Sequence, residues 1–439
     1  MKYANLLRAA RVRAGMTQQQ LADLSTVSIR AIRDQELGHA RAPRKETVRL
    51  LADALQLSEV RRLKLEAAAA CRLGAESLGG ELPQPPTPLQ PIVGRQGDVA
   101  SLTELLGQSG HRLITVAGIA GVGKTRLIQE VVNSLHLANR VPVIWLSADG
   151  GGDRPSGLSG RISALLTGEC AVEDIADMLA DANVLLVIEG HRIGRGVEST
   201  IRALLHRCPG LRVVYETREP LPHLEGAVGH TVLPLTTPAW SPGGTDASFA
   251  DYPAVQFLLS QCSRLRPETM FDPEAVSAIA GIACLLDGIP LALKTAAFGL
   301  DFYEPTQLLD IVSRSSLAFV RPRFPSDADL PGMLTQTVRS LGPKDAQVLR
   351  RLAAAHKPWS LQGAIAQLGG SPAELMQRIY TLTCYGLVRR VGPPADRQAG
   401  RFMVLNLICH ALDELRPTSR ELPLVVLQQR VPPLVEVCR

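Results

Sequence analysis

The sequence lacks the features that would place it in a membrane or cross-link it. No apolar run in its 439 residues approaches the roughly 18 that a membrane-spanning helix needs. The first residues lack the apolar stretch of a signal peptide, so we expect a cytoplasmic protein with no membrane contact. Its eight cysteines are scattered without a C-x-x-C pair, which favours reduced thiols over disulfides or a zinc site.

The composition is globular, with 46% hydrophobic and 20% charged residues, and the length suffices for about three domains. The net charge of +5 is unevenly placed. Residues 1–75 hold 14 Lys and Arg against 7 Asp and Glu, and the remainder holds 33 against 35. A basic module on a nearly neutral body indicates nucleic acid as its partner, although a merely solvated basic face gives the same count.

A glycine-rich motif follows the apolar run Leu113–Val116. Residues Gly118–Thr125 fit G-x-x-x-x-G-K-[ST] and precede an amphipathic segment. Glycines let backbone N–H groups converge on phosphate oxygens, and the helix N-terminus adds a favourable dipole. In this motif Lys124 reaches the β- and γ-phosphates and Thr125 binds Mg²⁺. The alternative is an ordinary glycine-rich turn; the strand–loop–helix context instead predicts nucleoside triphosphate binding.

The N-terminal module has a helix-turn-helix pattern. Thr17 and Ser28 are natural N-caps, and a tight turn separates the two short helices that they begin. Periodicity predicts a helix that stops at Gly15 and further helices over residues 18–24, 28–36, 46–55 and about 58–70.

This module resembles the phage-repressor (XRE/Cro-type) helix-turn-helix family. The resemblance rests on G-M-T-Q-Q-Q-L-A-x-x-S-x-V-S, I-R-x-x-E-x-G and T-V-R-L-L-A-D-A-L. It implies that the second helix of the motif enters the major groove of a double-stranded operator. The DNA contacts implied are Gln18, Gln19, Ser28, Ile29, Arg30, Arg33, Arg41, Arg44 and Lys45. Gln35 stands where the family has an apolar core residue, so it is either exposed or weakens the module. A module kept only for protein interaction is the alternative.

A proline-rich linker precedes a region in which short apolar runs alternate with helical patterns. Near-continuous apolar strands separated by helices predict a parallel sheet covered on both faces, with ligands at the carboxyl ends of the strands. The expected strands are 113–116, 142–146, 184–188 and 211–215, and the expected helices between them are 159–167, 171–181 and 195–206.

Several motifs occur here in a fixed order, namely V-G-R, the phosphate loop, L-L-V-I with an acid, T-R-E-P and G-I-P-L-A-L. This order resembles the signal-transducing (STAND) ATPases of the NB-ARC type, from about Pro91 to Leu412. The resemblance implies ATP or ADP with Mg²⁺, Thr125 and Glu189 as metal-binding residues, and Glu189 as the catalytic acid. The cofactor-binding residues implied are Val93, Arg95, Gly118, Gly121, Val122, Gly123, Lys124, Thr125, Arg126, Arg218 and Pro290. Among them, Val93 and Arg95 lie near the base and ribose, Pro290 closes over the adenine, and Arg218 senses the γ-phosphate.

The sequence departs from that family after the third expected strand. Glu189 replaces the usual Asp, and Gly190, His191 and Arg192 follow where a further acid or polar group normally activates water. Loss of a general base typically costs about 10²–10⁴-fold in rate, so we expect at most slow hydrolysis, as a switch. His191 and Glu219 remain possible substitutes for the base.

Helical patterns fill residues 250–300, and three more helices at 343–354, 360–368 and 372–384 precede two short strands. This order predicts a winged helix, which in the resembled family acts as a latch on the nucleotide domain. Arg389, Arg390 and Arg401 could instead support DNA binding by the wing. The family's Met-His-Asp latch motif falls near Val404–Asn406, where Leu405 replaces the histidine and Asn406 the acid.

The fold class expected is therefore multidomain: an all-α helix-turn-helix domain, an α/β P-loop NTPase with a parallel sheet, a helical subdomain and a winged helix. The expected bounds are 1–75, a linker at 76–91, then 92–240, 241–325, 326–415 and a tail at 416–439.

The sequence predicts a nucleotide-switched DNA-binding transcriptional regulator, with self-association in one nucleotide state. No repeat at periods of about 34–45 residues occurs, so the sensor is a separate protein or the nucleotide itself is the signal. Two alternatives remain: a STAND-type ATPase in defence or signalling whose N-terminal module recruits a protein partner, and a degenerate nucleotide domain that only dimerises the chain.

Overall fold

The structure is a computed structural model. It describes residues 3–37, 45–58, 61–62, 65, 69, 85–88, 90–107, 110–147, 162, 172–179, 182–189, 197–218, 226–242, 244, 246–265, 271–323, 327–354, 357–391 and 401–415. In those ranges, no helix combines the length and the apolar character needed to cross a membrane.

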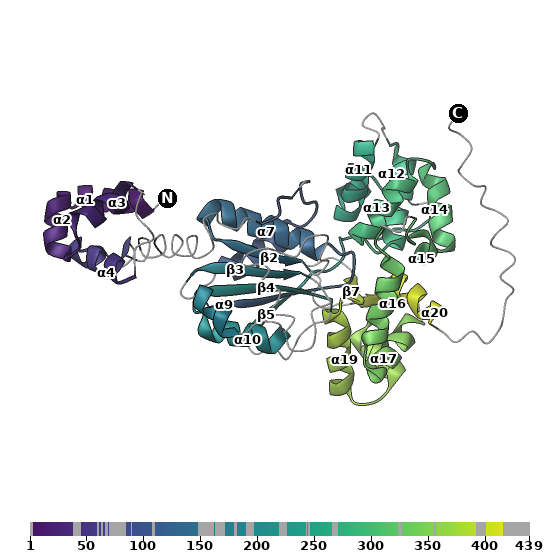
Figure 1. Cartoon of the computed structure of the whole chain (residues 1–439). Coiled ribbons are helices and arrows are strands. Elements are labelled where there is room, and N and C mark those ends of the chain that lie inside the picture. Colours follow the sequence, from purple (N-terminus) through teal and green to yellow (C-terminus); the bar gives the residue numbers. More distant parts are fainter. Residues whose placement is uncertain are drawn as a thin grey trace.

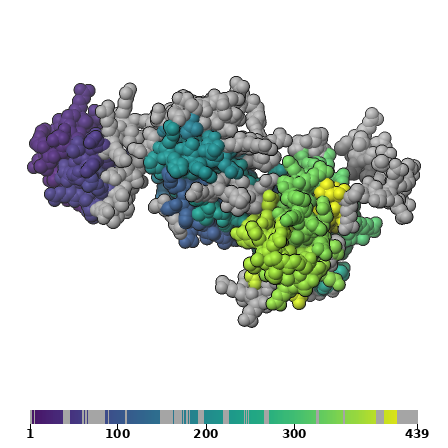
Figure 2. Space-filling view, turned by 90° about the horizontal axis from the view of Figure 1, so that it is seen from below, coloured from purple at the N-terminus to yellow at the C-terminus, as the bar shows by residue number. Residues whose placement is uncertain are grey.

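Four helices that the structure describes in full belong to the N-terminal module at one end of the molecule (Figures 1 and 2). They are α1 (Tyr3–Arg13), α2 (Gln18–Ser25), α3 (Ile29–Leu37) and α4 (Lys45–Ala54). The expected caps are present: the Thr17 hydroxyl accepts the Gln20 N–H at 3.1 Å, and the Ser28 hydroxyl accepts the Ala31 N–H at 3.2 Å. The module has its own core, built on Leu7, Leu21, Ile32, Val48 and Leu51.

Gln35 is a core residue of this module, so the expectation that it is exposed is wrong. It is only 5% exposed, and its side-chain oxygen accepts a hydrogen bond from the Tyr3 hydroxyl at 2.9 Å. A buried amide costs little once it is hydrogen-bonded. Beside it, the buried Glu36 pairs with Arg11 at 2.6 Å.

The centre of the molecule is a five-stranded sheet in the order β2-β3-β4-β1-β5, in which every neighbouring pair is parallel. Its strands are β1 (Leu113–Ala117), β2 (Val143–Ser147), β3 (Val184–Glu189), β4 (Leu211–Thr217) and β5 (Ala227–Thr231). This confirms the α/β class. Only β5 was not predicted, because its sequence A-V-G-H-T carries a glycine and is half-buried rather than apolar.

Helices cover both faces of the sheet (Figure 1). On one face lie α6 (Gln96–Gly107) and α7 (Lys124–Asn139), and on the other α9 (Val172–Leu179) and α10 (Val197–Arg207). Each apolar strand therefore has two apolar faces to bury, as parallel sheets require. Of the helix expected at 159–167, only Ile162 lies within the described residues.

A helical region follows the sheet. It comprises the 3₁₀ turn η1 (Ala247–Asp251) and the helices α11 (Pro253–Leu265), α12 (Pro273–Leu285), α13 (Pro290–Gly299), α14 (Pro305–Arg314) and α15 (Ser316–Phe319). Four of these helices begin with a proline, whose missing N–H costs nothing at the first helical position. The G-I-P-L-A-L motif supplies the start of α13.

The last region is α16 (Leu330–Ser340), α17 (Pro343–Ala353), β6 (Trp359–Ser360), α18 (Leu361–Leu368), α19 (Pro372–Cys384), β7 (Val388–Val391), β8 (Arg401–Val404) and α20 (Asn406–Glu414). The strands form an antiparallel sheet in the order β6-β8-β7. Helices α17 to α19 and strands β7 and β8 lie where the sequence predicts the elements of a winged helix.

Candidate functional site

The glycine-rich motif forms the loop between β1 and the start of α7. Gly118, Gly121 and Gly123 have φ values of 152°, 74° and 98°, which side chains with a Cβ rarely adopt. Helix α7 begins at Lys124, so its first N–H groups have no partner within the helix and face the loop. Such a helix N-terminus is a ready-made site for phosphate.

Lys124 lies folded against its own loop. Its Nζ donates to the carbonyl oxygens of Gly118 at 3.0 Å and Ile119 at 3.2 Å, and the side chain is 6% exposed. Burial lowers the pKa of Lys124 to about 8; the charge of Arg218 acts in the same direction, whereas the nearby Glu216 carboxylate opposes it. A buried ammonium with only carbonyl partners and one acid is available for an anionic ligand.

Two carboxylates lie at the ends of neighbouring strands. Thr125 Oγ1 donates to Glu216 Oε2 at 2.8 Å, whereas Glu189 Oε2 accepts a hydrogen bond from Trp145 Nε1 at 2.9 Å. Burial raises the pKa of Glu216, although the charge of Lys124 and the hydrogen bond from Thr125 oppose the rise. Our sequence reasoning missed Glu216; the signal was its place at the carboxyl end of a strand, like that of Glu189.

These residues fit a magnesium–nucleotide complex. Mg²⁺ is usually held by one or two carboxylates together with phosphate oxygens, and Thr125, Glu189 and Glu216 supply a hydroxyl and two carboxylates beside the loop. Bound there, the ion would neutralise phosphate charge.

The helical and C-terminal regions cover the loop. The Leu291 N–H of α13 donates to the Gly121 carbonyl at 3.2 Å. A Cβ on Gly121 would lie 2.8 Å from Leu291 Cβ and 3.2 Å from Leu330 Cδ1 of α16. A Cβ on Gly123 would lie 3.9 Å from Pro290 Cγ. The phosphate loop therefore cannot change shape without affecting α13 and α16.

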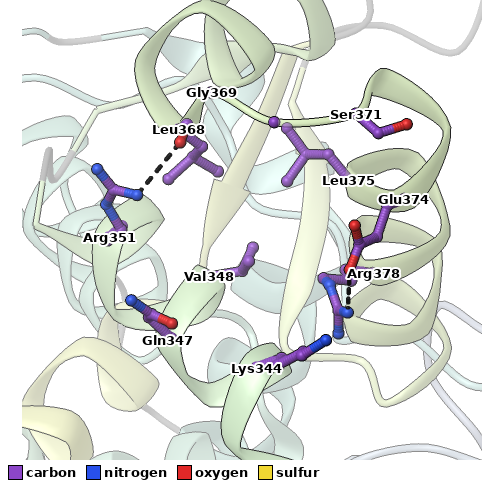
Figure 3. Close-up of a pocket in the computed structure, with 11 residues that line it drawn as sticks. Lys344, Gln347, Val348, Arg351, Leu368, Gly369, Ser371, Glu374, Leu375 and Arg378 are labelled. Carbon is purple, nitrogen blue, oxygen red and sulfur yellow. Dashed lines mark hydrogen bonds and ion pairs between the residues drawn. The ribbon is translucent and has the colours of Figure 1, made fainter.

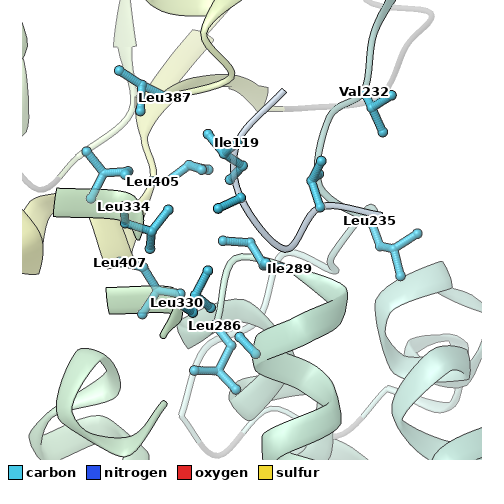
Figure 4. Close-up of a cluster of buried hydrophobic side chains, with 14 of the residues drawn as sticks. Ile119, Val232, Leu235, Leu286, Ile289, Leu330, Leu334, Leu387, Leu405 and Leu407 are labelled. Atoms are coloured by element: carbon cyan, nitrogen blue, oxygen red, sulfur yellow. The ribbon is translucent and has the colours of Figure 1, made fainter. Parts of the chain in front are cut away.

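Ile119 extends this contact into the C-terminal region. It is completely buried, in a cluster with Leu387 and Leu405 on one side and Ile289 on the other (Figure 4). Gly386 packs so closely that a Cβ on it would lie 3.5 Å from the Ile119 nitrogen. Leu405, at the histidine position of the expected latch motif, thus belongs to an apolar contact with the loop.

A buried acid joins the helical and C-terminal regions. Asp287, just before α13, accepts the backbone N–H groups of Asn406 at 2.9 Å and Leu407 at 2.8 Å, and so caps α20. The Asn406 amide donates to the carbonyl of Leu285 at 2.8 Å. Complete burial raises the pKa of Asp287 to about 6, against the effects of Arg389 and the two N–H groups. Local sequence patterns do not predict this contact, which joins residues 119 positions apart.

The other expected cofactor residues surround the loop. Arg95 is 6% exposed, and its guanidinium donates to the carbonyls of Leu233 at 2.6 Å and Val122 at 2.8 Å. Arg126 donates to the Gln90 carbonyl and pairs with Glu130 at 2.8 Å. Arg218 Nη2 lies 3.0 Å from Met333 Sδ of α16, and Val93 is half-buried. Arg95 thus stabilises the loop through its hydrogen bond to Val122, and Arg218 links the end of β4 to the C-terminal region.

Six of the nine expected DNA-contacting residues have side chains that the structure describes. Ser28, Ile29, Arg30 and Arg33 lie exposed on one surface at α3. Gln19 is exposed and donates to Asp23 at 2.9 Å, whereas Gln18 donates to Glu36 at 2.7 Å. Arg41, Arg44 and the side chain of Lys45 lie outside the described residues.

The C-terminal region offers a different surface. A cavity of about 250 Å³ is lined by α17, α19 and the turn before α19 (Figure 3). Its Arg378 pairs with Asp345 at 2.9 Å and Glu374 at 2.6 Å. On α19 the exposed large hydrophobic side chains are Met376 and Tyr380. Arg389 donates to Thr237 at 2.8 Å, toward the nucleotide domain. Helix α19 carries one glutamate and one arginine and so has no net positive charge, whereas α17 carries Lys344, Arg350 and Arg351 against Asp345.

Comparisons with known proteins agree with the helix-turn-helix assignment of the N-terminal module. Residues 7–61 match a family described as helix-turn-helix, so the module is a helix-turn-helix domain. An uncharacterized protein of Mycobacterium tuberculosis is 25% identical over 228 residues, which are 50% of this chain and 53% of that protein. A longer protein of the same organism, provisionally named an HTH-type transcriptional regulator, is 25% identical over 46% of this chain and 21% of its own length. The chain thus spans about half or less of these relatives.

Among solved structures, a STAND protein with a tetratricopeptide repeat sensor from Pyrococcus horikoshii aligns with 77% of this chain and 44% of its own, at 14% identity and a TM-score of 0.30. AMPPCP-bound DnaA from Aquifex aeolicus aligns with 66% of this chain and 89% of its own, at 12% identity and a TM-score of 0.32. TM-scores of this size carry no argument, so the fold rests on the sheet order and the contacts above.

Proposed function

We propose that this chain is a DNA-binding transcriptional regulator whose adenine-nucleotide state sets how its domains pack. The observation that carries the proposal is the cover on the phosphate loop. Gly121 and Ile119 touch α13, α16 and the β7–β8 sheet region, so a nucleotide and the neighbouring domains share one loop. A ligand shifts such an equilibrium by its different affinity for the two packings.

The helix-turn-helix domain is the proposed output. Arg30 and Arg33 on the exposed surface of α3 would contact base edges or phosphates. The relative provisionally named a transcriptional regulator supports this reading. Two modules brought together by self-association would read half-sites about 34–36 Å apart, or multiples of that spacing.

We place the domains at 1–75, 92–240, 241–325 and 326–415, with a linker at 76–91 and a tail at 416–439. The bound ligand is ATP or ADP with Mg²⁺, held by Lys124 and Thr125 and by acids at the strand ends. In the proposed complex, Val93, Arg95 and Pro290 would lie beside the base and ribose of the nucleotide. Arg218 would lie beside its γ-phosphate. Because Glu189 is engaged by Trp145, we expect phosphate release well below about 1 s⁻¹, the lower range of ordinary enzymes.

Equilibrium binding of ATP and ADP to the purified full chain tests the nucleotide site. We expect binding to be lost in Lys124→Ala and kept in Lys294→Ala, whose side chain is exposed on α13. Absence of any adenine-nucleotide binding, or equal binding by Lys124→Ala, would contradict the proposal. Steady phosphate release above about 1 s⁻¹ would favour an ATP-hydrolysing enzyme instead.

A further inference from the structure

Glu216 is the acid nearest the metal-binding residue of the phosphate loop. It is the penultimate residue of β4 and is 8% exposed. Its Oε2 accepts the Thr125 hydroxyl proton at 2.8 Å, and its Oε1 lies 3.8 Å from Lys124 Nζ. One carboxylate thus touches both side chains that give the loop its chemistry.

Glu216 and Glu189 lie on different strands and have different hydrogen-bond partners. Strand β4 lies directly beside β1, with Glu216 paired to Val116 in register, whereas β3 lies one strand further away. The side chain of Glu189 instead accepts the Trp145 indole proton at 2.9 Å.

We propose that Glu216, rather than Glu189, is the principal acid that positions Thr125 for Mg²⁺ in the nucleotide complex. The inference rests on the proposed nucleotide site. A hydroxyl binds a metal through its oxygen lone pair, so its proton needs another acceptor. Glu216 already accepts the hydrogen bond from the Thr125 hydroxyl, so the oxygen lone pairs of Thr125 are free to bind the ion. The order of the motifs assigns the metal-positioning role to Glu189 at the end of β3, and in this chain we assign it to Glu216 in β4.

This arrangement also predicts what Glu216 does without metal. Its charge lies beside the expected phosphate position and opposes an anionic ligand until Mg²⁺ is present. Replacing Glu216 by the isosteric Gln removes that repulsion and also weakens the hold on the Thr125 proton. The variant therefore separates metal-independent from metal-dependent nucleotide affinity.

The test is calorimetric titration of ATP into the nucleotide-free full chain, in EDTA and over a range of Mg²⁺ concentrations. Partners of metal ligands typically contribute about 10–100-fold to metal affinity. We expect Glu216→Gln to weaken the apparent Mg²⁺ affinity by about that factor, while ATP binding in EDTA is unchanged or tighter. Glu189→Gln should lose less, and Glu198→Gln, exposed on α10, is the matched control.

A Thr125→Val background guards against a folding defect. There the hydroxyl is absent, so adding Glu216→Gln should reduce Mg²⁺ affinity no further. The inference is overturned if Glu216→Gln keeps the wild-type Mg²⁺ dependence, if Glu189→Gln loses more, or if the two changes in the cycle are additive. If the wild type binds no adenine nucleotide under any condition, the proposed function fails first and this inference falls with it.

Discussion

Lys124→Met should stabilise the nucleotide-free protein while it abolishes nucleotide binding. Burial moves the pKa of Lys124 from 10.5 to about 8. At about 1.36 kcal/mol per pKa unit, the buried ammonium costs about 3 kcal/mol at pH 7, a figure that already includes the attraction of Glu216. Methionine keeps the apolar stem but loses two hydrogen bonds to carbonyls, worth about 1 kcal/mol each. The net expectation is a gain of about 1–2 kcal/mol in the free energy of unfolding.

The assay is urea denaturation of wild type and variant at several pH values, with bound nucleotide removed. Above pH 8 the folded wild type releases the Lys124 proton, whereas the unfolded chain keeps it until about pH 10.5. Stability conferred by this group therefore rises with pH across that window, and the advantage of the variant shrinks. Lys294→Met, on an exposed face of α13, should change little at any pH. A variant less stable than wild type at pH 7, or a gap that does not narrow above pH 8, would refute the reasoning.

Three further outcomes follow from the same contacts. Asp287→Ala leaves two N–H groups of α20 without an acceptor, at about 1–3 kcal/mol each, but also removes a buried carboxylate that costs about 3 kcal/mol at pH 7, so in urea it should lower the free energy of unfolding by up to about 3 kcal/mol; a gain in stability would mean that the cap is dispensable. Gly121→Ala forces a Cβ against α13 at a φ of 74° and should destabilise the chain by more than about 1 kcal/mol in thermal unfolding, so an unchanged midpoint would show that α13 does not hold the loop. Arg30→Ala with Arg33→Ala should weaken binding to DNA selected from a random library by at least about 30-fold, since such arginines contribute about 1–3 kcal/mol each; Arg202→Ala on α10 is the control, and equal losses would contradict the DNA-contact assignment.

Local signals carried most of the sequence-based prediction. Thr17 and Ser28 predicted the starts of α2 and α3, because the hydrogen bond of an N-cap joins residues only three positions apart. The loop from Gly118 to Thr125 was predictable because its glycines and lysine lie within a single strand–turn–helix segment. Apolar runs without alternation likewise predicted strands β1 to β4, since a parallel sheet buries both faces.

What escaped prediction depends on neighbours that are distant in sequence. Glu216 acquires its role because β4 lies beside β1, which strand periodicity does not reveal. Asp287 caps a helix that begins 119 residues later. Gln35 occupies a position where an apolar residue was expected, and its hydrogen-bond partner Tyr3 lies on another helix, α1. In each case a polar side chain meets a partner that only the tertiary fold supplies.

Coupling between nucleotide and DNA tests the central claim most directly. The measurement is the affinity of the full chain, loaded with ATP or with ADP, for a DNA site selected from a random library. Allosteric coupling of about 1–3 kcal/mol predicts that the two states differ at least about fivefold, and that Lys124→Ala removes the difference. Equal affinity in both states, with nucleotide bound in each, would show that the loop does not control the DNA reader.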